Sequence, residues 1–225
     1  VELGFPPMRC IVTAGPTVEP LDAVRRLTNH STGTLGTDLA NHLACGGHEV
    51  LLLRSRTATA APPLHAVTTE AFGTSRELLE RFQALATHGP VAIFHAAAVG
   101  DFEIGAVFRR DDDGRLTPVH SGKFSTRDGS LLAELRPTPK ILAQLRDLYP
   151  KAWITGWKYE VDGSRDEVLA RARAQLEDGH SDAVVANGPA HGPGFTWLTR
   201  TSEHPVPDVR ALNRILEQAL PARTQ

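Results

Sequence analysis

The amino-acid sequence predicts an α/β fold built around a mostly parallel sheet, with one antiparallel excursion. Short apolar runs alternate with stretches of helical periodicity, which is the pattern of a parallel sheet covered by helices on both faces. Residues 100–135 break this alternation, because they contain strand-like runs and turn sequences but no helical period. We therefore expect a three-layer domain that carries an extension of antiparallel strands.

The expected elements follow one another in a regular order. Apolar runs predict strands at 8–13, 48–53, 91–96, 152–156 and 182–186, and helical periodicity predicts helices at 33–46, 74–88, 138–147, 164–178 and 208–220. Gly46 and Gly47 supply an end signal for the first helix, and Ser164 with Glu167 predicts a capping box at the fourth. A further strand-like run, FTWLT, precedes the last helix.

The excursion contains the strand-like runs AVFRR, RLTPV and SLLAEL, separated by the turn sequences DDDG and TRDG. The three aspartates before Gly114 favour a hairpin turn over a metal-binding loop. We expect residues 120–128 to form a mobile loop. The chain as a whole, residues 1–225, is expected to form one domain.

The composition is that of an ordinary soluble globular protein. Hydrophobic residues make up 41% and charged residues 22%, and a net charge of −2 gives no footprint for nucleic acid or an anionic membrane. A membrane-spanning helix requires about 20 consecutive apolar residues, and no apolar run in the sequence is that long. Cys10 and Cys45 lack CxxC spacing and follow no secretory segment, so we expect both to be reduced and buried in a cytoplasmic protein.

The first strand leads to a candidate phosphate site that is interrupted. The strand reaches Gly15, but the first helix begins only at Gly33, after the cluster NHST. Hydroxyl groups followed by glycine at a helix start offer hydrogen-bond donors to an anion, and a phosphate group is the obvious ligand. Residues 16–32 would then form a loop that folds over the site and delivers Asn29, with Arg25 as a further candidate.

Longer stretches resemble one enzyme family. VTAGPTVEPLDAVRRLTNHSTGTLG, residues 12–36, is similar to the patterns ITAGPT and EP-DPVR-ISNHSSG-MG of the phosphopantothenate–cysteine ligases, also called phosphopantothenoylcysteine synthetases. The likeness continues in order through HAAAVGDFE, GKFSTRDGSLLAEL, PTPKIL, GWKYE and DAVVAN, and it covers roughly residues 9–187. It implies a Rossmann-like fold.

The resemblance implies a two-step reaction in coenzyme A biosynthesis. Such ligases activate the carboxylate of 4'-phosphopantothenate with ATP or CTP, release pyrophosphate, and form an amide when the amine of cysteine attacks the acyl nucleotide. This chemistry needs positioning and charge neutralisation more than an acid–base pair. Mg²⁺ is expected to accompany the nucleoside triphosphate, with no flavin and no metal site of the protein's own. In the family the excursion helps to pair two subunits, so a homodimer is expected.

The resemblance also implies roles for individual residues. Asn29 and Lys123 would be catalytic, Asn29 at the acyl nucleotide and Lys123 on a loop that closes over the reacting groups. Arg25 and Asn29 would contact the acid substrate. The nucleotide and its phosphates would be held by Gly15, Pro16, Thr17, Ser31, Thr32, Gly33, Ala97, Ala98, Asp101, Thr138, Pro139, Lys140, Ile141 and Trp157.

The sequence departs from the family in the charges expected near the nucleotide. The CTP-using bacterial pattern has lysines on the helix before VAN, where this chain has Gln175 and Gly179. GWKYEVDG and RARAQLE are closer to the ATP-using eukaryotic pattern, and Lys158, Arg171 or Arg173 could supply the missing charge. The preferred nucleotide therefore stays open.

Two other classes of function fit parts of the pattern. An NAD(P)-dependent reductase would need G-x-G-x-x-G after the first strand and an acidic residue after the second, but the second strand ends LLLRSR and neither Tyr149 nor Tyr159 heads a Y-x-x-x-K pair. A non-catalytic nucleotide-binding homologue, or a ligase of another acid or amine, stays open because the phosphate lysines differ. Retention of Asn29 and Lys123 favours turnover.

Overall fold

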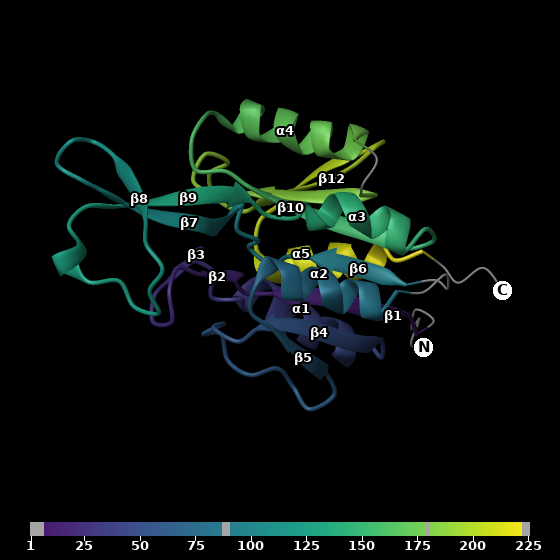
Figure 1. Cartoon of the computed structure of the whole chain (residues 1–225). Helices are drawn as coiled ribbons and strands as arrows, with labels where there is room; N and C mark the ends of the chain where they lie inside the picture. Colours follow the sequence, from purple (N-terminus) through teal and green to yellow (C-terminus); the bar gives the residue numbers. More distant parts are fainter. Residues whose placement is uncertain (1–6, 87–90, 179–180, 222–225) are drawn as a thin grey trace, which may run out of the picture.

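The computed structural model describes residues 7–86, 91–178 and 181–221, and its centre is an eight-stranded sheet (Figure 1). The strand order is β13-β12-β11-β10-β6-β1-β4-β5. The strands from β11 to β5 are parallel to one another, whereas β12 and β13 pair antiparallel with their neighbours. The mostly parallel sheet predicted from the sequence is confirmed.

The strands of this sheet are β1 Arg9–Ala14, β4 Glu49–Ser55, β5 Thr68–Phe72, β6 Ala92–His95, β10 Trp153–Tyr159, β11 Ala183–Asn187, β12 Phe195–Thr199 and β13 Glu203–Val206. The helices are α1 Thr34–Cys45, α2 Ser75–Ala84, α3 Ile141–Leu148, α4 Arg165–Glu177 and α5 Val209–Gln218. The capping box of Ser164 and Glu167 is present at the start of α4, as predicted.

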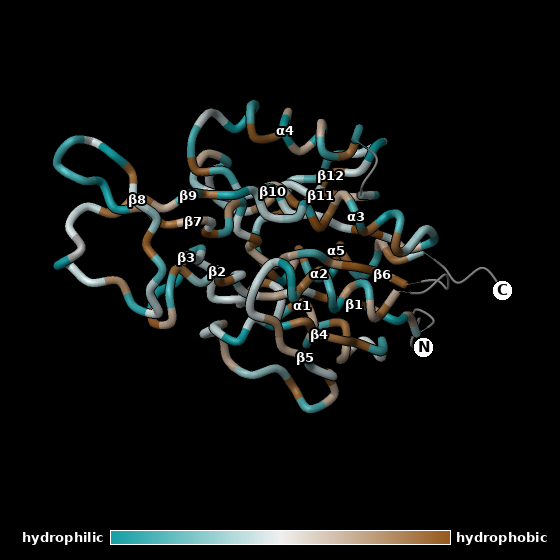
Figure 2. Tube along the Cα trace, in the orientation of Figure 1, coloured by the Kyte–Doolittle hydropathy of each residue, from teal (hydrophilic) through white to brown (hydrophobic). Residues whose placement is uncertain are grey.

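Helices cover both faces of the sheet because side chains alternate between the faces along each strand. On one face, Val12 of β1 packs in a cluster with Leu39 of α1 and Leu212 of α5. On the other face, the neighbouring Ile11 packs in a cluster with Leu78 of α2, α3 joins the same cluster, and α4 covers β11 beside it. Figure 2 shows hydrophobic residues gathered along the central strands. The three-layer arrangement is therefore confirmed.

The antiparallel excursion forms a separate sheet that extends from the body of the molecule (Figure 1). Its strands are β7 Phe102–Arg110, β8 Leu116–Pro118 and β9 Leu131–Pro137, in the order β8-β7-β9. The DDDG sequence is a hairpin turn, since the Asp111 N–H donates to the Arg115 carbonyl at 2.9 Å. Hydrogen bonds from Arg109 and Thr117 lower the pKa of the Asp111 carboxyl group. The ionised Asp111 side chain therefore stabilises this turn.

Several elements differ from the sequence-based expectation. The helix predicted at 138–147 begins only at Ile141, because Pro139 disfavours helical geometry at Thr138 and Lys140 is the non-helical N-cap residue. The helix predicted at 74–88 ends at Ala84, and residues 87–88 lie outside the described residues. β5 was not predicted, because TTEAF is a largely exposed edge strand with no apolar run. β13 was missed for the same reason.

The two cysteines are free thiols in different environments. Cys10 is buried in β1, and burial raises the pKa of its thiol to about 12, which makes it unreactive. Cys45 is exposed, so the prediction that it is buried is wrong. It is the last residue of α1, beyond the turns whose side chains pack on the sheet.

Within the described residues, no helix has the length and apolar character needed to cross a membrane.

His95, the last residue of β6, is buried close to the carboxyl edge of the sheet. Its Nδ1 atom lies 3.1 Å from the hydroxyl oxygen of Thr13 on β1. Burial lowers the pKa of the imidazole from 6.5 to about 4, so the ring is neutral in the folded protein at pH 7.

We expect His95 to make the protein less stable as the pH falls from 6.5 to about 4. The unfolded chain takes up a proton in this window and the folded chain does not, so the free energy of unfolding falls by up to about 3 kcal/mol. Urea unfolding at several pH values gives the slope of the free energy of unfolding against pH. The difference in this slope between the wild type and His95→Gln measures the contribution of His95. The exposed His65→Gln serves as the control, and equal slopes for His95→Gln and the wild type would contradict the prediction.

Candidate phosphate and substrate site

The residues between Gly15 and Gly33, predicted as a loop over the site, contain a short β-hairpin. β2, Val18–Pro20, pairs antiparallel with β3, Arg26–Thr28. The strands are short and β3 is exposed, so the sequence carries no apolar run to mark them. Because the hairpin leaves from the end of β1 and returns to the start of α1, it places Asn29 beside both.

Three glycines bring the end of β1 and the start of α1 into contact. Gly15 and Gly33 have φ values of 88° and 83°, a conformation that favours glycine. A Cβ on Gly36 would lie 2.5 Å from the carbonyl oxygen of Thr13. A tight turn, a close backbone approach and close helix–strand packing are also the roles of the three glycines in a dinucleotide-binding loop. Here the hairpin separates the first of them from the other two.

The backbone N–H groups at the start of α1 lie at this junction. Gly33 is the N-cap residue and has no side chain to cap the helix, while the Thr32 hydroxyl accepts from the Thr34 N–H at 3.3 Å. The first N–H groups of a helix lack acceptors within the helix, and they sit at the positive end of its dipole. The hydroxyl groups of Thr32 and Thr34, 2.8 Å apart, lie beside them. We call residues 31–36 the cradle, and its chemistry suits an anion.

The cradle lies where the strand order reverses. The chain passes from β1 to β4 on one side and later returns to β6 on the other side of β1. The segments that follow β1 and β6 are joined there: the Ala98 N–H donates to the Gly15 carbonyl at 3.0 Å, and the Thr17 N–H donates to the Ala98 carbonyl at 3.1 Å. Asn29 Nδ2 donates to the same carbonyl at 3.2 Å. In open α/β sheets, ligands bind in such a crevice.

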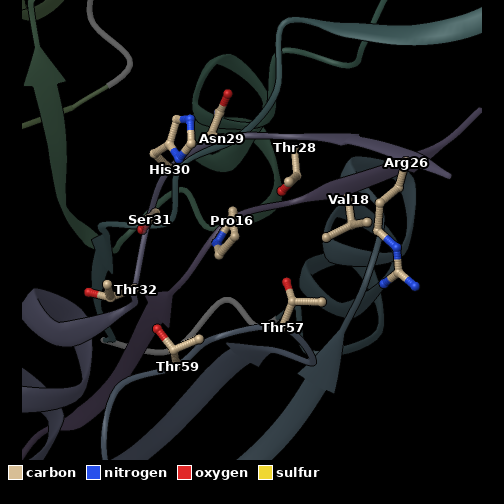
Figure 3. A pocket seen from close by; sticks show the side chains of 10 residues that line it. All are labelled: Pro16, Val18, Arg26, Thr28, Asn29, His30, Ser31, Thr32, Thr57 and Thr59. Carbon is tan, nitrogen blue, oxygen red and sulfur yellow. The ribbon is translucent and has the colours of Figure 1, made fainter.

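A pocket of about 330 Å³ lies in front of this junction (Figure 3). In Figure 3 the side chain of Arg26 lies on one side of it, and those of Thr32 and Thr59 lie on the opposite side. Its lining is rich in hydroxyl groups and comes from the hairpin, the cradle and the segment after β4: Pro16, Val18, Arg26, Thr28, Asn29, His30, Ser31, Thr32, Thr57 and Thr59.

Sequence reasoning missed Arg26, Thr57 and Thr59 as residues of this pocket. Thr57 and Thr59 follow β4, and the carboxyl ends of neighbouring parallel strands meet at one edge, so their position after a strand was an available signal. Arg26 gave no such signal, because it lines the pocket only as a result of the pairing of β2 with β3. Its guanidinium group has no ion pair or hydrogen bond with any residue that the structure describes.

A second group of predicted residues lies on the β6 side of the junction. The Thr138 N–H donates to the Asp101 carbonyl at 3.0 Å, and Lys140 Nζ lies 2.6 Å from the Asp101 carboxylate. The Thr17 hydroxyl accepts from the Gly100 N–H at 2.9 Å and so links this group to the segment that follows β1. The side chains of Lys140 and Asp101 are 70% and 71% exposed, so this ion pair contributes little stability and can exchange for a ligand.

Three further predicted residues make no polar contact with the cradle through their side chains. Pro139 precedes α3, and Ile141, the first residue of α3, is buried in the core. Trp157 follows Gly156, which is level with His95 in the sheet, and its ring packs against the core on the α1 and α5 face. The indole Nε1 is buried and has no acceptor among the described residues.

The turn that carries Arg25 contacts the loop that carries Lys123 at the far end of the hairpin. Arg25 lies in the turn between β2 and β3, and its Nη2 atom donates to the carbonyl of Phe124 at 3.0 Å. Lys123 is exposed, and its ammonium group has no partner within the described residues. The roles of both residues toward a substrate stay predictions.

The cations considered as replacements for the missing lysines lie at different edges of the sheet. Lys158 and Arg171 both pair with Glu160, which follows β10 at the same edge of the sheet as the cradle. Arg173 pairs with Glu203 at the start of β13, near the opposite edge. Lys158 and Arg171 are therefore the better placed pair. In the described part of the chain, no group of three or more His, Cys, Asp or Glu side chains is placed to hold a metal ion.

Gln175 is turned toward the sheet. A Cβ on Gly156 would lie 2.5 Å from its amide nitrogen, and that nitrogen is buried without a partner among the described residues. Gly179, the other position at which the family has lysine, lies outside the described residues.

The fold and this edge define a doubly wound, Rossmann-like α/β domain with a candidate anion cradle at its topological switch point. The chain belongs to the family described as DNA/pantothenate metabolism flavoprotein C-terminal domain, whose sequence profile matches residues 7–202.

Similar proteins agree with this membership. The chain is 33% identical over 180 residues to the coenzyme A biosynthesis bifunctional protein CoaBC of Thermococcus kodakarensis, which covers 80% of this chain and 41% of that relative. The chain thus spans less than half the length of this relative. The C-terminal domain of a CoaBC protein superposes with a TM-score of 0.69 at 27% identity, covering 96% of this chain and 95% of that chain. The DNA/pantothenate metabolism flavoprotein from Streptococcus pneumoniae has the same fold, with a TM-score of 0.82 at 24% identity over 94% of this chain and 97% of that chain.

We expect Gly36→Ala to destabilise the protein, because the added methyl group would overlap the carbonyl of Thr13. Overpacking of this kind costs about 1–3 kcal/mol, and it must also exceed the gain of about 1 kcal/mol from the helix propensity of alanine. Urea unfolding measures the change. Gly122→Ala is the control, since a Cβ there meets nothing within 4 Å. A Gly36→Ala protein as stable as the wild type would show that β1 and α1 need not touch.

Proposed function

We propose that this chain is a phosphopantothenate–cysteine ligase domain, which joins 4'-phosphopantothenate to cysteine at the expense of a nucleoside triphosphate. The observation that carries the proposal is the hairpin that brings Asn29 to the junction between the cradle and the segment after β6. Family membership and the likeness to a CoaBC C-terminal domain support it. The CoaBC relatives are named as proteins of coenzyme A biosynthesis.

The proposed reaction has two balanced steps. A carboxylate oxygen of the acid attacks the α-phosphorus, the bond from that phosphorus to the β-phosphate oxygen breaks, and pyrophosphate leaves. The amine of cysteine then attacks the acyl carbon, a C–N bond forms, the bond from carbon to the phosphate oxygen breaks, and the nucleoside monophosphate and a proton leave. Neither step needs a redox partner. Mg²⁺ would enter with the triphosphate.

The two sides of the junction suit the two large substrates. We assign the nucleotide to the β6 side, where Thr138 and Lys140 lie and where the Trp157 N–H lacks a partner among the described residues. We assign the acid to the pocket on the β4 side, where Arg26 faces Thr32 and Thr59 across the cavity. Asn29 lies between the two sides, where the acyl nucleotide would form. The cradle and the Lys123 ammonium group would balance the phosphate charge.

The experiment that tests this function is pyrophosphate release with 4'-phosphopantothenate and Mg²⁺. ATP and CTP are supplied separately, each with and without cysteine. Release with one nucleotide, and amide formation only when cysteine is present, is the expected result and identifies the base. No release with either nucleotide from folded protein would favour a nucleotide-binding homologue or a ligase of another acid.

In this assay we expect Asn29→Asp to separate the two steps. The negative charge opposes the acyl phosphate during attack by cysteine, so amide formation should fall about 100-fold while pyrophosphate release continues. Asn41→Asp, which makes the same change in α1 at a residue that contacts Leu64, is the matched control. Unaltered amide formation by Asn29→Asp would remove Asn29 from the mechanism.

We also propose that the chain forms a homodimer through the β7-β8-β9 sheet. Phe102 and Leu135 of this sheet are 44% and 51% exposed. Ile104 is paired with Leu135, and Phe102 is paired with Pro137 two positions along, so these side chains lie on one face. The family resemblance implies that the excursion helps to pair two subunits, and we assign this face to a second copy of the chain.

We expect Leu135→Arg to convert the dimer to a monomer, because a charged side chain in an apolar interface loses its hydration without gaining a partner. Light scattering measures the mass. Leu64→Arg is the control, since Leu64 is 49% exposed but lies in the loop before β5. The proposal fails if the wild-type chain is monomeric, or if Leu135→Arg leaves the mass unchanged.

A further inference from the structure

The loop that carries Lys123 is fastened to the hairpin by one carboxylate. Asp22 lies in the turn between β2 and β3, and its side chain is 0% exposed although the turn itself is at the surface. Its Oδ1 atom accepts from the N–H groups of Val24 and Arg25 at 2.9 and 2.7 Å. Its Oδ2 atom accepts from the Phe124 N–H at 3.2 Å. A single carboxylate therefore orders its own turn and binds the loop after β8.

Three further hydrogen bonds complete this contact. The Ala23 N–H donates to the Gly122 carbonyl at 2.9 Å. Arg25 donates through Nη1 to Asp22 at 3.2 Å and through Nη2 to the Phe124 carbonyl at 3.0 Å. Both neighbours of Lys123 are thus held through their backbones. We call this group of contacts the clasp. Figure 1 shows the loop between β8 and β9 reaching the tip of the β2–β3 hairpin.

The clasp depends on Asp22 being ionised. Burial alone would raise the pKa of its carboxyl group, but hydrogen bonds from the amides of Val24, Arg25 and Phe124, together with the Arg25 charge, lower the pKa below its usual value. An ionised carboxylate accepts hydrogen bonds at both oxygens and can donate none. The buried ring of Phe124, 6% exposed in a loop that is otherwise exposed, adds apolar contact to the polar ones.

We propose that Asp22 is a positioning residue that couples the Lys123 loop to β3, the strand that leads to Asn29. This inference rests on the proposed ligase function, in which both residues act on the same intermediate. From Arg25 to Asn29 the chain runs four residues, about 13 Å of extended strand. The clasp thus joins the loop to the opposite end of the element that presents Asn29. Neither the family resemblance nor the sequence pattern assigns this role to Asp22.

Limited trypsin digestion tests the clasp without any substrate. In Asp22→Asn an amide NH₂ replaces one oxygen, so the side chain can no longer accept at both positions, and we expect cleavage after Lys123 to become about tenfold faster. Mass spectrometry resolves this site from the other lysines and arginines. The control is Asp111→Asn, which changes a carboxylate that also accepts side-chain hydrogen bonds, but in the β7–β8 turn. An unchanged rate after Lys123 in Asp22→Asn would overturn the clasp.

A double-mutant cycle tests the coupling in the full reaction. If Asp22 acts through Lys123, Asp22→Asn should lower kcat in the wild-type background but change it less than twofold in the Lys123→Gln background. Equal losses in both backgrounds would mean a merely structural role and would overturn the proposal. If no reaction occurs in the wild type, the ligase function fails while the trypsin result on the clasp still holds.

Discussion

The close contact between the end of β1 and the start of α1 is the constraint on which the rest of the site depends. Gly36 has no side chain, so the helix can lie directly against the backbone of Thr13. This contact fixes the direction of the helix dipole and leaves the start of α1, with glycine as its N-cap residue, at the carboxyl edge of the sheet. It also forces the inserted residues to leave and return at almost the same point. An antiparallel hairpin meets that requirement, because its two ends lie side by side.

The hairpin then divides the carboxyl edge of the sheet into two parts. On one side, Gly100, Asp101 and Thr138 are linked to the end of β1 through Thr17. On the other side, the segment after β4 closes the pocket against the hairpin and the cradle. The polar contacts on the first side are partly exposed and exchangeable, as the Asp101–Lys140 pair illustrates. An edge built in this way can hold one ligand in each part and bring their reactive ends together at Asn29.

Much of this architecture could be predicted from the sequence because it depends on local patterns. Apolar runs and helical periodicity identified the parallel strands, and the glycines at 15 and 33 marked the cradle. The hairpin, β5 and Arg26 could not be predicted, since exposed short strands have no apolar period and their pairing depends on distant contacts. The clasp is the extreme case. Asp22 and Phe124 are 102 positions apart, and no local pattern indicates that a turn aspartate will meet that loop.

The clasp also explains why the hairpin turn can be polar and yet ordered. An exposed ion pair gives little stability, because water competes for both charges. The Asp22 carboxylate is enclosed instead, and three backbone N–H groups and one guanidinium group replace the water it has lost. Because those donors come from two segments, neither segment can move far without leaving a buried charge without partners, which is costly. The hairpin and the loop after β8 should therefore move as one unit, so the position of Lys123 is set by the same element that sets the position of Asn29.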